Sequence, residues 1–128
     1  MLELWNGGEL DLVEEVYASD CVLGDGRPLR PDDVREGLNL LREAFPDQGF
    51  TVEDELHHGA TVVMCLRWSG SHRGRFVSPL GTIEATGRKF SVSGIEIFDV
   101  RADRVTRVSL AWDMVQLLSQ LGARLTSS

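Results

Sequence analysis

The chain has 128 residues, a formal net charge of −7 and 42% apolar residues. This length suits one domain with a sizeable core, which we expect over residues 1–128, and the composition excludes a disordered chain. The acidic balance, without any basic run, argues against nucleic acid and anionic membranes as partners, and no apolar run approaches the ~20 residues of a membrane span.

The cysteines and histidines exclude two further kinds of site. Cys21 and Cys65 are isolated in the sequence, which predicts core thiols in a reducing compartment, most simply the cytoplasm. His57, His58 and His72 are too few and wrongly spaced for a zinc site built from histidines. We therefore expect no metal.

The first twenty residues predict two helices. Residues 1–5 resemble the tail of a helix that ends at the glycines of residues 6–8. A second helix is expected to follow, with Leu10, Val13 and Tyr17 on one face.

A short strand and a longer helix come next. Residues 21–23 predict the strand and residues 24–28 a loop rich in turn residues. Pro31 suits the first turn of the helix, and Pro46 ends it. Its apolar stripe recurs at helical spacing: Val34, Leu38, Leu41 and Phe45.

After residue 49 the pattern changes to strands. We expect strands over residues 50–58, 61–69, 90–100 and 105–112, joined in part by tight turns. The second of these is the most apolar, and its side chains alternate between two faces. One face carries Val62, Met64, Leu66 and Trp68, and the other carries Val63, Cys65, Arg67 and Ser69.

This order of elements predicts an α+β domain. Helices come first, long antiparallel strands follow, and a short helix ends the pattern, so we expect helices packed on one face of a strongly curved sheet of four to six strands. A bent sheet covered by helices forms a cone-shaped pocket that suits a small apolar or aromatic ligand.

Asp113 is the first candidate for acid/base chemistry. The alternation of the last strand stops there, and a helical pattern begins at Met114 and ends at Gly122. A carboxylate held partly dehydrated between apolar residues becomes a better proton acceptor and donor near neutral pH. The alternative is structural, because Asp at a helix N-cap, with Gln116 three residues on, satisfies free backbone N–H groups.

Five further residues are candidates for ligand binding, each with a structural alternative. Arg67 would stabilise an enolate or pair with an acid such as Glu96, which would itself be an ion-pair partner or a second titrating group. His72 would be a proton shuttle or an exposed histidine at a strand end. Met64 and Trp68 would form pocket wall or plain core.

Several segments resemble one family. They are GELDLVEEVYASDCVL, REAFPDQGFTVEDELHHGATVVMCLRWSGSHRG, GRKFSVSGIEIFDVRADRVTRVSLAWD and QLLSQLG. The chain resembles the SnoaL-like polyketide cyclases of the nuclear-transport-factor-two-like α+β barrel superfamily, over nearly its whole length. The most specific pieces are Phe45-Pro46-Asp47, Arg67-Trp68 with Gly70 and His72-Arg73-Gly74, and Trp112-Asp113 with Gln120-Leu121-Gly122.

The resemblance implies a cofactor-free intramolecular aldol ring closure on an apolar polyketide ester, with Asp113 as the acid/base. Sheets of this shape often pair through their outer faces, so we also expect a homodimer. Many members carry a polar pair at the end of the first strand, where this chain has residues 22–25, VLGD. The superfamily also contains isomerases, epoxide hydrolases and hydroxylase-type relatives, so another enzyme, or a ligand-binding or dimerisation module without catalysis, stays an alternative.

Overall fold

The computed structural model describes residues 2–7, 10–78 and 81–122, which form helices packed against one long-stranded sheet. In chain order the elements are α1 (Leu2–Gly7), η1 (Leu10–Leu12), α2 (Val13–Val16), β1 (Tyr17–Leu23), α3 (Pro31–Ala44), β2 (Gly49–His58), β3 (Thr61–Ser71), β4 (Phe76–Ser78), β5 (Gly81–Ile83), β6 (Lys89–Arg101), β7 (Arg104–Trp112) and α4 (Met114–Gln120). Within those ranges no helix is both long and apolar enough to cross a lipid bilayer.

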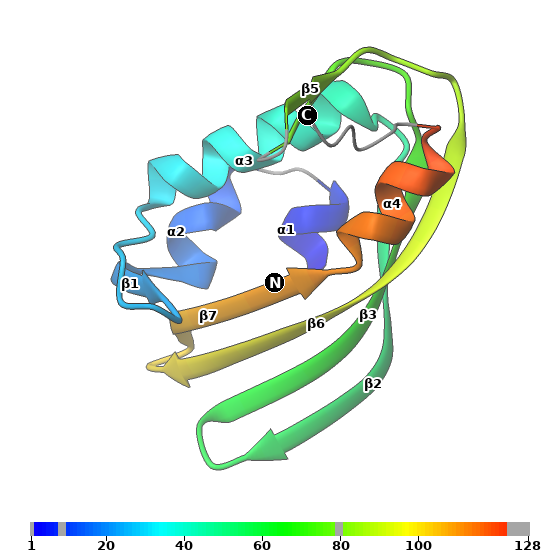
Figure 1. Cartoon of the computed structure of the whole chain (residues 1–128). Coiled ribbons are helices and arrows are strands. Elements are labelled where there is room, and N and C mark those ends of the chain that lie inside the picture. The colour runs from blue at the N-terminus through cyan, green and yellow to red at the C-terminus, as the bar shows by residue number, and fades with distance from the viewer. Residues whose placement is uncertain (1, 8–9, 79–80, 123–128) are drawn as a thin grey trace.

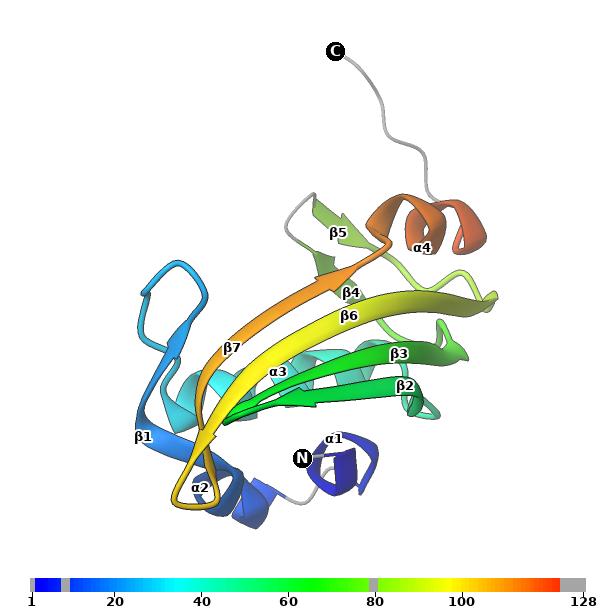
Figure 2. The same ribbon diagram turned by 90° about the horizontal axis from the view of Figure 1, so that it is seen from below.

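Five strands form one curved sheet in the order β1-β7-β6-β3-β2, while β4 pairs with β5 in a separate ribbon (Figure 1). The pairs β2–β3, β3–β6 and β6–β7 are antiparallel, as the sequence predicted. At the edge, however, β1 lies parallel to β7, so the sheet is mixed rather than wholly antiparallel. Figure 2 shows the long strands bending together around the side on which α3 lies.

The second helix is much shorter than the sequence predicted. Only η1 and the four residues of α2 are helical, and Tyr17 is the first residue of β1 rather than part of a helix face. Tyr17 pairs with Val105 of β7, while its backbone N–H donates to Val13 O and closes α2. The aromatic side chain favours a strand, and tertiary pairing overrides the helical spacing of the sequence.

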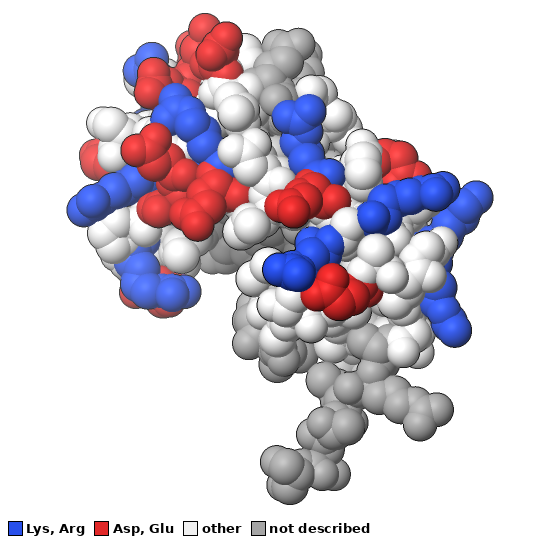
Figure 3. All heavy atoms as spheres, turned by 90° about the horizontal axis from the view of Figure 1, so that it is seen from above, with Lys and Arg blue, Asp and Glu red and all other residues white. Residues whose placement is uncertain are grey.

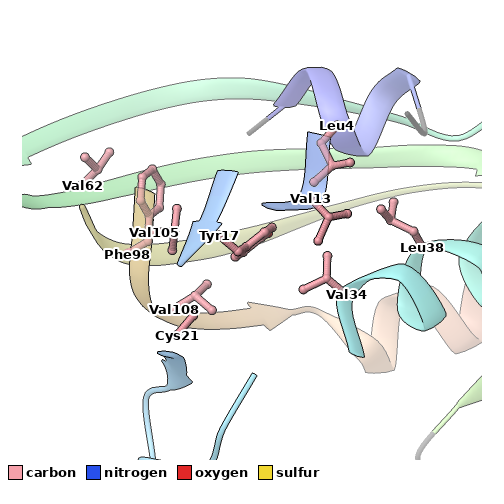
Figure 4. Close-up of a cluster of buried hydrophobic side chains, with 10 residues drawn as sticks. All are labelled: Leu4, Val13, Tyr17, Cys21, Val34, Leu38, Val62, Phe98, Val105 and Val108. Atoms are coloured by element: carbon pink, nitrogen blue, oxygen red, sulfur yellow. The ribbon is translucent and has the colours of Figure 1, made fainter. Parts of the chain in front are cut away.

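Helix α3 covers the concave side of the sheet. It begins at Pro31, where the Arg30 backbone N–H donates to Asp33 Oδ2 at 2.8 Å, and it ends at Ala44. Its apolar stripe contributes to two buried clusters, which are separate because the helix runs the length of the sheet. Figure 4 shows the first cluster, in which Val34 and Leu38 of α3 lie near Val13 and Tyr17.

Charged side chains of both signs are interspersed on the surface. Arg35 of α3 donates to Glu14 Oε1 and to Asp32 Oδ1, each at 2.8 Å. Figure 3 shows acidic and basic groups mixed on the face seen from above, with neither sign dominating it.

Candidate active site

A cavity of about 550 Å³ lies between the concave face of the sheet and the segments α1, β1 and α3. This size is within the usual range for small-molecule sites. Most of its wall is apolar or aromatic, from residues of almost every element that borders it: Trp5, Leu23, Leu29, Val34, Leu41, Phe50, Met64, Leu66, Val108, Leu110 and Trp112.

Glu96 is the buried carboxylate of this cavity. It lies in the middle of β6, where its strand neighbours are Met64 of β3 and Leu110 of β7. Only 7% of the residue is exposed, and among the described residues no cation pairs with it. Burial raises the pKa of the Glu96 carboxyl to about 7.

The alternation of β6 explains why an acid points inward. Phe90, Val92, Gly94, Glu96 and Phe98 are buried, while the residues between them are exposed. Glu96 therefore occupies an inward position that apolar residues or glycine fill elsewhere along the strand. Gly94 also serves the cavity, because a Cβ there would overlap the Trp112 indole that forms part of the wall.

Tyr17 and Trp5 add a polar pair to the same cavity. The Trp5 indole Nε1–H donates a hydrogen bond of 2.9 Å to Tyr17 Oη. Burial raises the pKa of the Tyr17 phenol, the hydrogen bond from Trp5 lowers it, and the charge of Glu96 raises it further. Tyr17 is therefore a neutral hydroxyl group facing the cavity at physiological pH.

The rim of the cavity is charged. Asp25, Arg27 and Asp33 line it, and Arg27 Nε lies 2.6 Å from Asp25 Oδ2. The last residue of β1 and the residue after it, Leu23 and Gly24, also line the cavity.

Asp113 lies outside this cavity. Its exposed side chain accepts the Gln116 backbone N–H at 3.0 Å and caps α4, while its own N–H donates to Ser93 O. The geometry therefore agrees with the structural alternative, in which Asp113 is the N-cap of a helix. A catalytic role for Asp113 stays a prediction.

Arg67 is not among the residues that line the cavity. It is exposed on β3, where Nε lies 3.4 Å from Glu53 Oε1 and Nη1 donates to Ser91 Oγ at 3.1 Å. The expected pair between Arg67 and Glu96 does not form, since the two side chains leave the sheet on opposite faces.

Of the other candidates, Met64 lines the cavity, whereas Trp68 and His72 lie in the packed end of the molecule. Trp68 is buried, and its Nε1–H donates to Gln48 Oε1 at 3.0 Å. His72 is fully buried rather than exposed, and its Nδ1 accepts the Thr86 backbone N–H at 3.3 Å.

The sequence did not single out Tyr17 or Trp5 as site residues. Trp5 was correctly placed on the first helix, whereas Tyr17 was placed on a helix face by its spacing, and nothing in that pattern shows that β1 pairs with β7 and brings Tyr17 to the cavity. Among the residues that the structure describes, no three His, Cys, Asp or Glu side chains cluster as metal ligands would. The site thus offers one buried acid, one phenol and an apolar wall.

Comparisons with known proteins identify the family that has this architecture. Residues 1–121 match the model of the SnoaL-like polyketide cyclase family. No curated protein sequence matches the chain.

Solved structures agree with that family in fold. IdmH from Streptomyces antibioticus, a candidate polyketide cyclase, shares 26% identity at a TM-score of 0.80, covering 95% of this chain and 93% of its own. A candidate polyketide cyclase from Acidithiobacillus ferrooxidans shares 26% identity at a TM-score of 0.80, with coverages of 94% and 87%. TsrD from Streptomyces laurentii shares the fold at a TM-score of 0.83 and 23% identity, with coverages of 96% and 90%. The chain belongs to the SnoaL-like polyketide cyclase family.

Proposed function

We propose that the protein is a cofactor-free acid/base enzyme and that Glu96 moves the proton. The observation that carries this proposal is a buried carboxyl, in an otherwise largely apolar cavity, that forms no ion pair with any residue the structure describes. A group with a pKa of about 7 is both a competent base and a competent acid at neutral pH.

The proposed reaction is an intramolecular aldol ring closure on an apolar, polyketide-like ester. Ionised Glu96 takes a proton from a carbon between two carbonyl groups, and the C–H electron pair forms an enolate. The enolate carbon then attacks a ketone of the same molecule, which forms the new C–C bond and leaves an alkoxide. Glu96 returns its proton to that alkoxide. Because the first proton is already acidic, much of the catalysis is holding a flexible chain in one reactive conformer.

We assign this role to Glu96 rather than to Asp113, the residue that the family resemblance favours. Asp113 is exposed and already accepts a backbone N–H at the start of α4. Glu96 lies between Met64 and Leu110 on the cavity wall, where the ligand's apolar body would displace water.

The decisive experiment measures exchange of the α-protons of methyl benzoylacetate, an aromatic β-ketoester, with D₂O by NMR. The native protein is expected to accelerate exchange above the buffer rate, and Glu96→Gln is expected to remove about 10²–10⁴-fold of that acceleration. Asp113→Asn is the matched control, since it is the same acid-to-amide change outside the cavity, and it is expected to retain the rate within about twofold.

The reverse outcome, in which Asp113→Asn abolishes exchange and Glu96→Gln retains it, would return the catalytic role to Asp113. If the native protein binds the ester without accelerating exchange, the chain is better described as a ligand-binding module.

The expected homodimer is also a proposal. The outer face of β6 exposes Ile95 and Ile97, and Leu56 of β2 is exposed on the same face two strands away, as a dimer interface through the sheet would require. Analytical ultracentrifugation of the native protein and of Ile97→Lys tests it, with a dimer expected for the first and a monomer for the second. A native monomer contradicts it.

A further inference from the structure

The chain's one tyrosine has a hydrogen-bonding arrangement that the proposed role of Glu96 does not use. Tyr17 Oη accepts the Trp5 indole N–H at 2.9 Å, and indole can only donate. The phenolic proton must therefore point elsewhere. Among the side chains that the structure describes, those of residues 4–7, 10–78 and 81–122, no acceptor pairs with it.

The surroundings direct that proton to the cavity. Tyr17 is buried in the first apolar cluster (Figure 4). It also lines the cavity, which is the open space that it borders. Glu96, two strands away in the order β1-β7-β6, borders the same space. The two side chains therefore face one ligand volume.

Protonation of Glu96 moves negative charge to the ligand. When Glu96 takes a proton from carbon, the carboxyl becomes neutral and the charge appears on the carbonyl oxygen of the new enolate. A fixed donor at that oxygen stabilises the enolate more than the neutral ketone, since hydrogen bonds to charged acceptors are the stronger ones.

We propose that Tyr17, oriented by Trp5, donates a hydrogen bond to the ligand oxygen on which the enolate charge develops. Tyr17 keeps its proton throughout, so the only proton transferred is the one that moves between carbon and Glu96. Trp5 is a positioning residue, because it acts on the ligand through Tyr17. This inference rests on the proposed function.

The test uses Glu96→Gln, which imitates the protonated acid, and two bicyclic probes. One is 4-nitro-1-naphthol, which is anionic at mildly alkaline pH and imitates an enolate, and the other is its uncharged methyl ether. Tyrosine labelled with ¹³C at Cζ gives one NMR signal, because the chain contains a single tyrosine. We expect the naphtholate to shift this signal and the ether to leave it in place.

Affinities for the same two probes give the second measurement. Adding Tyr17→Phe to Glu96→Gln is expected to weaken naphtholate binding about 10–100-fold and ether binding less than about twofold. Adding Trp5→Phe is expected to weaken naphtholate binding by a smaller factor, since the phenol remains but loses its orientation.

Three results would overturn the inference: no shift of the tyrosine signal, equal weakening for both probes on Tyr17→Phe, or no binding of the naphtholate. If Tyr17→Phe fails to fold, the signal of the tyrosine-containing protein still decides the question. Failure of Glu96 as the base is distinguished separately, since the exchange assay with methyl benzoylacetate reports on Glu96 and these probes exchange no carbon-bound proton.

Discussion

The two ends of the concave sheet face differ in how they are filled. At one end Phe45 packs against Trp68, Phe76 and Phe90, with ring centroids 5.4, 5.1 and 4.7 Å apart. At the other end the same strands border a cavity of about 550 Å³ that contains Glu96. Inward-pointing side chains alternate along the strands in the same way at both ends. The cavity therefore results from the elements that cover the sheet and not from the strands themselves.

Each end buries an ionisable side chain, His72 in the filled end and Glu96 in the hollow end, and burial favours the neutral form of both. Burial lowers the pKa of His72 in the filled end and raises the pKa of Glu96 in the hollow end. His72 Nδ1 has Thr86 as a partner, whereas Glu96 faces open space. The difference indicates a packing role for the histidine and a ligand-directed role for the acid.

The largest effect on stability is expected at the filled end. Phe45→Ala removes a fully buried ring with aromatic neighbours on several sides, so it is expected to lower the free energy of unfolding by about 3–5 kcal/mol. Met64→Ala, beside the cavity, is the matched control and should cost less than half of that, since its side chain is only partly packed. Urea unfolding measures both, and equal losses would mean that the cavity end is as densely packed as the filled end.

Removal of the acid at the hollow end is expected to stabilise the fold. The pKa of Glu96 is about 7 in the folded protein and 4.5 as its ordinary value, so ionisation opposes folding increasingly as the pH rises from 4.5 to 7. Glu96→Gln is therefore expected to raise the free energy of unfolding above pH 7 by on the order of 2–3 kcal/mol, and by little below pH 4.5. Urea titrations at several pH values measure the difference. A gain in the free energy of unfolding that does not depend on pH would contradict the cost of ionising Glu96 in the folded protein.

His72, in the filled end, should make the free energy of unfolding depend on pH in the opposite direction. The pKa of His72 lies below its ordinary value of 6.5, so the unfolded chain binds the proton more readily and stability falls as the pH drops below 6.5. In the Glu96→Gln background stability is expected to fall as the pH drops below 6.5, and His72→Gln should flatten this dependence. His57→Gln, at an exposed histidine, is the matched control for the change of residue type.

The smallest effect is expected at Asp113. Asp113→Ala removes the cap of α4 and is expected to lower the free energy of unfolding by about 1 kcal/mol, whereas Asp113→Asn should cost less because Asn also caps well. Thermal unfolding of the two variants tests this order. Equal losses would indicate that the carboxylate does more than accept the Gln116 N–H.

The sequence predicted the strands well because their alternation is a local property. The residues of β3 were divided correctly between its two faces, with Arg67 on the face opposite Trp68. The alternation did not reveal which face borders a cavity, since this depends on α3 and β1, which are distant in sequence. The inward position of Glu96, which the sequence did name as a candidate, could have been inferred from the period of β6, because it falls in phase with Phe90, Val92 and Phe98.

Tyr17 could not have been placed in the same way. Its spacing from Leu10 and Val13 fits a helix face, and only the parallel pairing with β7 makes it the start of a strand. His72 was expected at the surface because Ser71 and Arg73 are polar neighbours, yet the loop around Thr86 covers it. Both misplacements concern contacts between segments far apart in the chain, which a local pattern does not encode.

The most direct test of the account is the pKa of the Glu96 carboxyl. Carboxyl-resolved ¹³C NMR measures it in the native protein, and the signal is assigned by its absence in Glu96→Gln. We predict a midpoint of about 7. A midpoint near the ordinary value of 4.5 would mean that water reaches the carboxylate freely, and it would contradict Glu96 as the base of a dehydrated site.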